Sequence, residues 1–256
     1  MTPDDPIRFA IGTFTRLPVP PPTQVDATVA GRGLALAPVV GAAIGLVSGS
    51  LLLVTGVDLI ARLLSATLVV GLAAWITRGL HWDGLADVAD GLGSAAPPER
   101  AREIMGRSDI GPFGVLTLGF TVALQVLSLA QLPAGVPAFA AWVLAVTLGR
   151  FAVAVACGRW VHAARADGLG AMAIGSVTPT RAAIAGALAA AVAVGAALGG
   201  PLPWSAALLW GPLAAIGVAL GLARLAQRRF GGSTGDVLGA TAELATVAVL
   251  LVLALQ

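Results

Sequence analysis

One short stretch concentrates acidic side chains and a histidine in an otherwise apolar chain: RGLHWDGLADVADGLGS, residues 78–94. His81, Asp83, Asp87 and Asp90 fall within ten residues of one another. On a helix, at about 100° per residue, Asp87 lies about 40° from Asp83 and Asp90 about 20° to the other side, so the three carboxylates share one stripe. The opposite face carries apolar side chains that can pack into a helical bundle: Leu85, Val88, Ala89 and Leu92.

Three carboxylates on one stripe repel one another, which raises their pKa values and calls for a positive partner. Hard oxygen ligands of this kind suit Mg²⁺, or alternatively Mn²⁺. Such ions usually act on phosphate or pyrophosphate, where they neutralise the charge that develops on the transferred group. The competing interpretation is a solvated acidic turn without chemistry. His81 precedes Trp82, so by itself it could equally be an interfacial residue.

A second acidic site is predicted near the end of the chain, in RRFGGSTGDVLGATAEL, residues 228–244. The glycine-rich part should form a loop, with Ser233 or Thr234 capping the helix that follows. Asp236 and Glu243 are seven positions apart and share a helix face. Glu243 then lies inside an apolar segment, where an ionisable side chain is costly and is a functional candidate. The turn before the helix, at Thr234 and Gly235, also offers backbone N–H groups to an anion.

A third stretch, EIMGRSDIGPFG, spans residues 103–114. Arg107, Ser108 and Asp109 are followed by glycines, and this combination could bind phosphate oxygens. An ordinary interfacial loop would have the same composition, so the pattern alone does not decide between the two.

The composition points to a membrane protein that holds these stretches in place. The 256-residue chain is 57% hydrophobic and only 11% charged, whereas a soluble domain carries roughly a quarter charged residues. Its mean hydropathy is +0.92 and its pI is about 9.9. All the basic residues are arginines and they are thinly spread, which argues against a nucleic-acid partner. The single cysteine, Cys157, lies in an apolar run and is interpreted as a small buried hydrophobe.

The apolar segments predict an all-α, polytopic helical bundle with about seven transmembrane helices. Each segment approaches the roughly 20 residues that a helix needs to cross the hydrocarbon layer. We expect one integral membrane domain over residues 1–256, with an N-terminal interfacial segment at 1–33 and the bundle at 34–256. The first ten residues, MTPDDPIRFA, do not read as a cleavable signal peptide. The predicted spans are Leu34–Val57, Leu59–Ile76, Phe113–Leu132, Val136–Cys157, Ala182–Leu198, Ala206–Leu222 and Val237–Leu255.

Arginine placement predicts how the bundle is oriented. With these spans, thirteen of the fifteen arginines fall on one side of the membrane, Arg62 falls on the other, and Arg150 lies within the fourth span. The positive-inside rule then gives a cytoplasmic N-terminus and an external C-terminus. The acidic stretches lie on the arginine-rich side, so the expected site faces the cytoplasm from a multi-pass cytoplasmic (inner) membrane protein.

Taken together, these stretches resemble the cobalamin synthase family, the adenosylcobinamide-GDP ribazoletransferases. The family pattern H-x-D-G-x-x-D-x-x-D-G is present as HWDGLADVADG, residues 81–91, and G-G-x-T-G-D-x-L-G-A-x-x-E-L as GGSTGDVLGATAEL, residues 231–244. An early F-x-T-R-L-P-V-P is similar to residues 14–20 with one position fewer, and E-G-L-G is similar to residues 167–170 with Asp for Glu. One departure is the family's D-S-R-x-G, which reads RSDIG at residues 107–111. An Asp–Arg couple could survive that exchange, but it leaves the individual roles of Arg107 and Asp109 open.

The resemblance implies a transferase that uses Mg²⁺ and takes a corrinoid and a nucleoside as substrates within the bilayer. A hydroxyl of α-ribazole, or of its 5′-phosphate, would attack the cobinamide-side phosphate of adenosylcobinamide-GDP and release GMP. Whether the chain forms a homo-oligomer is left open. The implied metal ligands are Asp83, Asp87 and Asp90, completed by Asp236 and Glu243. Asp90, or else His81, would accept the alcohol proton. The implied substrate-binding residues are Arg107, Ser108, Asp109, Thr234 and Gly235.

Two other functions have to be weighed against this one. Another acidic-motif membrane transferase, such as a CDP-alcohol phosphotransferase or an aromatic prenyltransferase, would use similar chemistry, but the Asp spacing of four and three matches neither. A transporter would suit seven spans and an intramembrane Glu243. However, transport sites lie near the bilayer midplane, whereas these acids cluster at one face.

Overall fold

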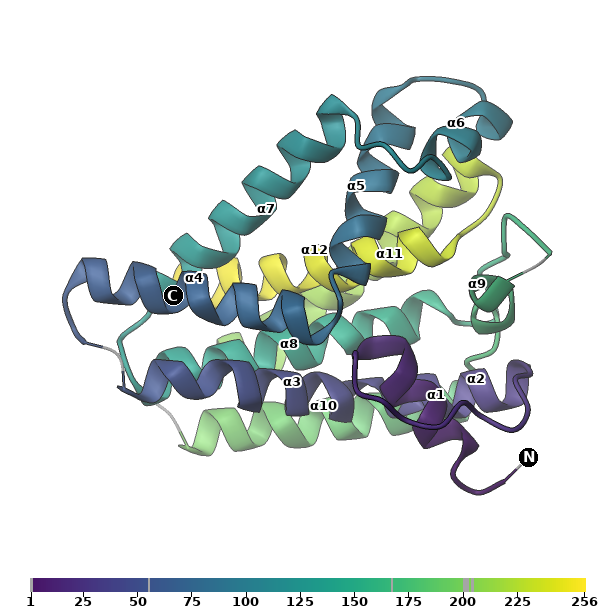
Figure 1. Ribbon diagram of the computed structural model, residues 1–256. Coiled ribbons are helices and arrows are strands. Elements are labelled where there is room, and N and C mark those ends of the chain that lie inside the picture. The colour runs from purple at the N-terminus through teal and green to yellow at the C-terminus, as the bar shows by residue number, and fades with distance from the viewer. Residues whose placement is uncertain (1, 55, 167, 200–202, 204) are drawn as a thin grey trace.

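The computed structural model describes residues 2–54, 56–166, 168–199, 203 and 205–256. In these residues the chain forms helices and no strand, which confirms the predicted all-α class (Figure 1). The α-helices are α1 (Asp5–Phe14), α2 (Ala27–Ala35), α3 (Ala37–Gly49), α4 (Leu59–Ile76), α5 (Leu80–Gly93), α6 (Pro98–Met105), α7 (Pro112–Gln131), α8 (Val136–Ala156), α9 (Gly168–Ala173), α10 (Pro179–Gly199), α11 (Gly211–Phe230) and α12 (Gly235–Ala254). A 3₁₀ turn, η1 (Ser50–Val54), extends α3, and a π-helical turn, η2 (Ala206–Trp210), precedes α11.

Seven of these helical stretches are long and apolar enough to cross a membrane, as the sequence predicts. Most boundaries lie within three residues of those predicted, and two of the differences have a local cause. The first span begins at Ala37 rather than Leu34, because Pro38 starts a new helix at α3 and leaves Leu34 and Ala35 in the separate α2. The sixth continues to Phe230, because arginine is a good helix former and α11 ends only at Gly231, whose φ is +74°.

Helix α8 lies at the centre of the bundle and is the most buried of the seven spans. Small residues let its neighbours approach closely, as in other membrane bundles. On α3, a Cβ added at Gly41 would lie 2.8 Å from the carbonyl oxygen of Val146. On α10, the buried residues form a stripe four positions apart: Ala185, Ala189, Ala193 and Ala197. The alanine-rich character of that span therefore serves close helix packing.

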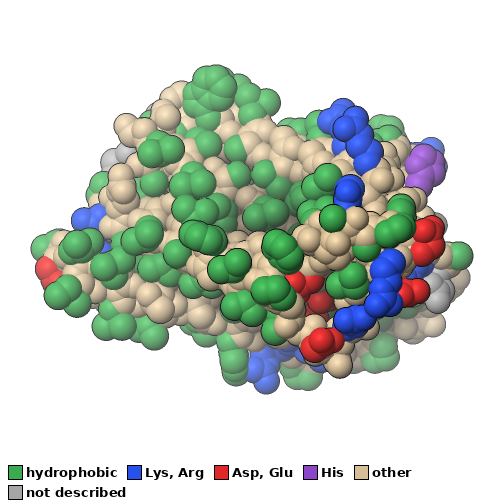
Figure 2. All heavy atoms as spheres, turned by 90° about the horizontal axis from the view of Figure 1, so that it is seen from above, with side chains coloured by type: hydrophobic (Ala, Val, Ile, Leu, Met, Phe, Trp, Pro, Cys, Tyr) green, Lys and Arg blue, Asp and Glu red, His purple; other side chains and the backbone are tan. Residues whose placement is uncertain are grey.

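The outer surface is apolar over most of the bundle. Figure 2 shows hydrophobic side chains covering one face, while charged side chains gather mainly at one end. Helices α4 and α7 supply many large exposed apolar side chains, including Leu64, Leu68, Leu116 and Phe120. An exposed apolar surface of this extent is typical of lipid contact.

The N-terminal segment folds as a helix that packs against the bundle rather than as a detached element. Phe9 and Phe14 of α1 are buried, whereas Ile7 and Leu17 are exposed. Asp5 anchors the proline-rich connection, because its carboxylate accepts hydrogen bonds from both the backbone N–H and the hydroxyl of Thr23. Burial opposes ionisation of Asp5, but these bonds and one from Thr2 hold its pKa well below its usual value.

Helix α5 is a separate element that turns away from α4. The break falls at Arg78 and Gly79, which have φ values of +60° and +68°; a left-handed conformation is easy for glycine and costly for arginine. Figure 1 shows α1, α2 and α9 at the end of the bundle near the N-terminus, with the C-terminus at the opposite end. The turn brings α5 across the first turns of α12.

Candidate active site

The crossing of α5 and α12 joins the two predicted acidic sites. Gly84 makes the contact, since a Cβ at this position would lie 2.8 Å from the Cα of Asp236. The absence of a side chain at Gly84 therefore allows the two backbones to approach. As a result, Asp83 and Asp87 of α5 lie beside Asp236, which occupies the first turn of α12.

The three aspartates influence one another electrostatically. Burial, followed by the charges of Asp236, Asp83 and Asp90, raises the pKa of Asp87 from 3.8 to about 7. Asp83 is the exposed member of the group. This surplus of negative charge is the feature that a divalent cation would relieve.

Asp90 shares the helix with Asp83 and Asp87 but has a different partner. Its two carboxylate oxygens accept the backbone N–H groups of Gly111, at 2.7 Å, and Gly114, at 2.9 Å. These residues begin α7, so Asp90 caps that helix from outside its own sequence. The loop that Asp90 holds carries Arg107, Ser108 and Asp109, which are exposed to solvent and lie outside the pocket described below.

Glu243 lies deeper along α12, in a buried polar network. It is 4% exposed, and Arg150 of α8, with which it pairs, is 2% exposed. The Arg150 guanidinium lies 3.5 Å from Glu243, and the Gln125 amide donates to the same carboxylate at 3.0 Å. The structure therefore separates Glu243 from the aspartates and gives it a counter-ion, Arg150, which the sequence around Glu243 does not indicate.

His81 of α5 also contacts this buried network. Arg150 approaches its Nδ1 at 3.3 Å, and because a guanidinium can only donate, Nδ1 must accept. Burial, followed by the charge of Arg150, holds the pKa of His81 well below its usual 6.5. The neutral ring therefore carries its proton on Nε2. The His81 ring also packs against the ring of Phe14, with the ring centroids 5.7 Å apart.

The glycine-rich GGSTG loop forms, as expected, just before α12. The Thr234 hydroxyl accepts the N–H of Val237 and caps the helix. The backbone N–H of Ser233 donates to the carbonyl oxygen of His162, and the carbonyl oxygen of Ser233 accepts the N–H of Ala164. Both partners belong to the segment after α8. The buried Ser233 hydroxyl has no hydrogen-bond partner among the described residues.

Arg165, from that same segment, is a basic residue whose sequence position indicates topology but no role in the site. It lies close enough to Asp236 to interact with it electrostatically, and it also donates to the backbone oxygen of Arg102. Its placement depends on the loop pairing with Ser233, for which the local sequence carries no signal. The neighbouring Asp167 of the DGLG stretch lies outside the described residues.

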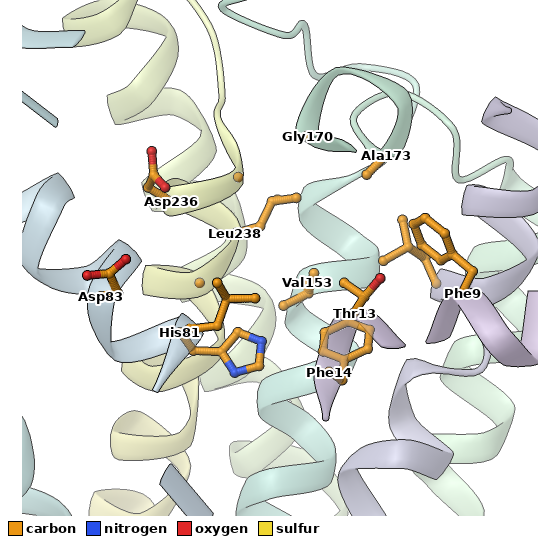
Figure 3. A pocket seen from close by; sticks show the side chains of 14 residues that line it. Phe9, Thr13, Phe14, His81, Asp83, Val153, Gly170, Ala173, Asp236 and Leu238 are labelled. Carbon is orange, nitrogen blue, oxygen red and sulfur yellow. The ribbon is translucent and has the colours of Figure 1, made fainter. Parts of the chain in front are cut away.

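A pocket of about 250 Å³ opens beside the acidic group. Figure 3 shows Asp83 and Asp236 at one side of it and Phe9 and Phe14 at the other. Elements far apart in the sequence contribute to its walls: α1, α2, α5, α8, α9 and α12.

In this structure Asp83, Asp87 and Asp236 are not arranged as a complete metal-binding site. Among the residues that the structure describes, no set of three or more His, Cys, Asp or Glu side chains is spaced to hold an ion. The oxygens available at the pocket are nevertheless the hard donors that Mg²⁺ and Mn²⁺ prefer.

Comparison with known proteins connects this arrangement to a family. The model of the cobalamin-5-phosphate synthase family matches residues 6–254. The adenosylcobinamide-GDP ribazoletransferase of Frankia casuarinae is 40% identical over 263 aligned positions, covering 97% of this chain and 94% of that protein. The protein of the same name from a Nocardioides species is 40% identical, covering 96% of this chain and 97% of its own length. The one from Citrobacter koseri is 37% identical, covering 94% and 95%. No solved structure matches the chain. The match over nearly the whole length shows that this chain belongs to the cobalamin-5-phosphate synthase family.

Proposed function

We propose that this protein is an adenosylcobinamide-GDP ribazoletransferase. A ribose hydroxyl of α-ribazole, or of its 5′-phosphate, attacks the phosphorus on the cobinamide side of the diphosphate. The bond from that phosphorus to the bridging oxygen breaks, and GMP leaves with the bridging oxygen. The product is adenosylcobalamin or its 5′-phosphate. Full-length similarity to relatives of that name supports this assignment.

The observation that carries the proposal is the meeting of Asp83, Asp87 and Asp236, of which Asp83 and Asp236 line a pocket. These residues come from α5 and α12, more than a hundred positions apart. Their mutual repulsion fits a divalent cation, and we assign Mg²⁺, with Mn²⁺ as the alternative, to these three carboxylates. Holding the ion requires the carboxylates to draw closer than they lie in this structure. A bound ion would supply positive charge against the phosphate oxygens during the transfer.

We assign Asp83 as the base: one of its carboxylate oxygens accepts the proton of the attacking ribose hydroxyl. This residue lines the pocket and is the exposed member of the group. The two bases expected from the sequence are less suitable. Both oxygens of Asp90 already accept backbone N–H groups, and His81 has its Nδ1 lone pair turned to Arg150 and its proton on Nε2.

The start of α12 is assigned to phosphate binding. Thr234 and Gly235 form the start of α12, and the backbone N–H groups at a helix N-terminus favour an anion. The Ser233 hydroxyl, which has no hydrogen-bond partner in the described part of the chain, lies next to them, and Arg165 adds positive charge nearby. Arg107, Ser108 and Asp109 project from the exposed loop before α7, and we place the departing GMP there.

The proposed location is the cytoplasmic (inner) membrane, with the acidic group facing the cytoplasm. The seven apolar spans make a multi-pass membrane protein. The orientation rests on the arginine distribution. The end of the bundle that carries the aspartates also carries the arginine-rich loops.

The test is GMP release by purified protein in detergent, given adenosylcobinamide-GDP and α-ribazole with Mg²⁺. We expect GMP and corrinoid product in equal amounts, and no reaction in chelator. Asp87→Asn should lower turnover at least a hundredfold, since charge-stabilising groups of this kind contribute about 10²–10³ in kcat. Asp4→Asn, at an exposed position before α1, is the matched control and should retain full activity.

Two outcomes would contradict the proposal. One is full activity of Asp87→Asn, and the other is accumulation of unmodified substrate in sealed vesicles without GMP release. The second would favour a transporter.

A further inference from the structure

The pocket beside the aspartates has two chemically different halves. Figure 3 shows the carboxylates of Asp83 and Asp236 at one side and the rings of Phe9 and Phe14 at the other, with Leu238 between them. Its apolar half is closed by α1 on one side and by α8 and α9 on the other. A ligand that fills it therefore needs an apolar part joined to a polar part that can approach the carboxylates.

Polar groups are few in the apolar half. The side chains there that offer them are the Thr13 hydroxyl and the His81 ring. Because Arg150 occupies Nδ1 of His81, the ring presents Nε2–H as a donor. A ligand placed here would meet aromatic and aliphatic surface, with a ring N–H and a hydroxyl as its hydrogen-bonding partners.

Besides their sugars, the substrates of the proposed reaction offer four ring systems, and only one suits this half. The corrin macrocycle is far larger than a cavity of about 250 Å³. Guanine, and likewise the adenine of the adenosyl group, carries several donors and acceptors on its edges, and burying them against apolar walls without partners would be costly. The benzimidazole base of α-ribazole is flat and apolar and has a single free ring nitrogen, which can only accept a hydrogen bond.

We propose that this pocket binds the benzimidazole base of the nucleoside, with the attached ribose directed toward Asp83 and Asp236. The assignment rests on the proposed function and gives one of its substrates a binding site. It makes the side chains at the wall of the pocket, Ala173 and Leu238 among them, determinants of which base is accepted. The corrinoid and its diphosphate then approach the carboxylates from outside the pocket.

The test compares the affinities of two free nucleosides for the purified protein, one with benzimidazole and one with 5,6-dimethylbenzimidazole as its base. Equilibrium binding is measured without the corrinoid substrate, so the result does not depend on turnover. Ala173→Leu narrows the pocket and should shift preference toward the smaller base by about tenfold, the size of effect that a methylene-sized change produces. Leu238→Ala widens the pocket and should shift preference in the opposite direction.

The matched control is Ala191→Leu, the same substitution at an exposed position of α10, which should leave the ratio of affinities unchanged. Equal ratios in all three variants, or no binding of either nucleoside to the wild-type protein, would overturn the inference. Failure of the proposed function looks different. The wild-type protein would then bind the nucleosides with the expected pattern but release no GMP.

Discussion

At the scale of single residues, the acidic side chains of the two motifs, at residues 81–91 and 231–244, do three different things. Asp83, Asp87 and Asp236 lie close together, and burial, followed by the neighbouring charges, raises the pKa of Asp87. Asp90 caps the start of α7. Glu243 balances a buried arginine. The residue type is almost the same in each case, so the surroundings decide whether a carboxylate is available for chemistry.

The raised pKa of Asp87 predicts how stability depends on pH when divalent ions are removed. Because the pKa rises from 3.8 to about 7 on folding, the folded chain holds a proton that the unfolded chain releases between those values. Stability should therefore fall as pH rises from about 4 to 7. We expect the melting temperature of the wild-type protein in chelator to decline over this window more steeply than that of Asp87→Asn.

Saturating Mg²⁺ supplies the second half of that experiment. A cation at the aspartates favours their ionised form, so the excess decline of the wild-type protein should disappear. Parallel pH profiles for wild type and Asp87→Asn in chelator would show that Asp87 is not perturbed. An excess decline that Mg²⁺ leaves unchanged would argue against an ion at these carboxylates.

The sequence predicted part of this residue-level arrangement. Helical spacing correctly placed Asp83 and Asp87 on one face, and two segments far apart were both identified as acidic. It did not predict that Asp90 would bond to α7, because that contact depends on where the glycines at 111 and 114 arrive. Arg150 was noted only as a residue inside a span, since nothing local identifies Glu243 as its partner.

At the scale of helices, the pair of Arg150 on α8 and Glu243 on α12 ties the two most buried spans together. Removing one partner of a buried ion pair leaves an uncompensated charge, which typically costs roughly 3 to 5 kcal/mol. We expect Glu243→Gln to lower the free energy of unfolding by about that amount. Denaturation of the purified protein in detergent measures it.

A double variant decides whether this loss comes from the ion pair. Glu243→Gln combined with Arg150→Gln removes both charges and should regain part of the lost stability, because no buried charge is left unpaired. If the double variant is no more stable than the sum of the two single changes predicts, Glu243 acts through some other partner. The metal role expected from the sequence would then regain support.

Helix positions were largely predictable, whereas breaks and directions were not. Long apolar runs locate the spans because a bilayer requires about 20 such residues. The turn between α4 and α5 depends on a left-handed Arg78, a conformation that arginine's own preferences do not indicate. The separation of α2 from α3 was missed because residues 34–38 are apolar on both sides of the break.

At the scale of the whole molecule, the charged side chains gather mainly at one end of the bundle (Figure 2). The N-terminus, α1, α2 and α9 share one end, and the C-terminus lies at the other (Figure 1). Thirteen of the fifteen arginines belong to segments that lead to the first of these ends. An odd number of spans, seven, accounts for the two termini lying apart. The catalytic chemistry proposed here is therefore confined to a single face of the membrane.

That orientation can be tested with single cysteines, because the native Cys157 is fully buried and should not react. Ser94→Cys, exposed at the end of α5, and Gln256→Cys, at the exposed C-terminus, report on opposite ends of the bundle. Since arginine-rich loops stay in the cytoplasm, a membrane-impermeant maleimide should label Gln256→Cys in intact cells. It should label Ser94→Cys only after the membrane is opened. The reverse pattern would place the aspartates outside the cell, and labelling of both in intact cells would contradict an odd number of spans.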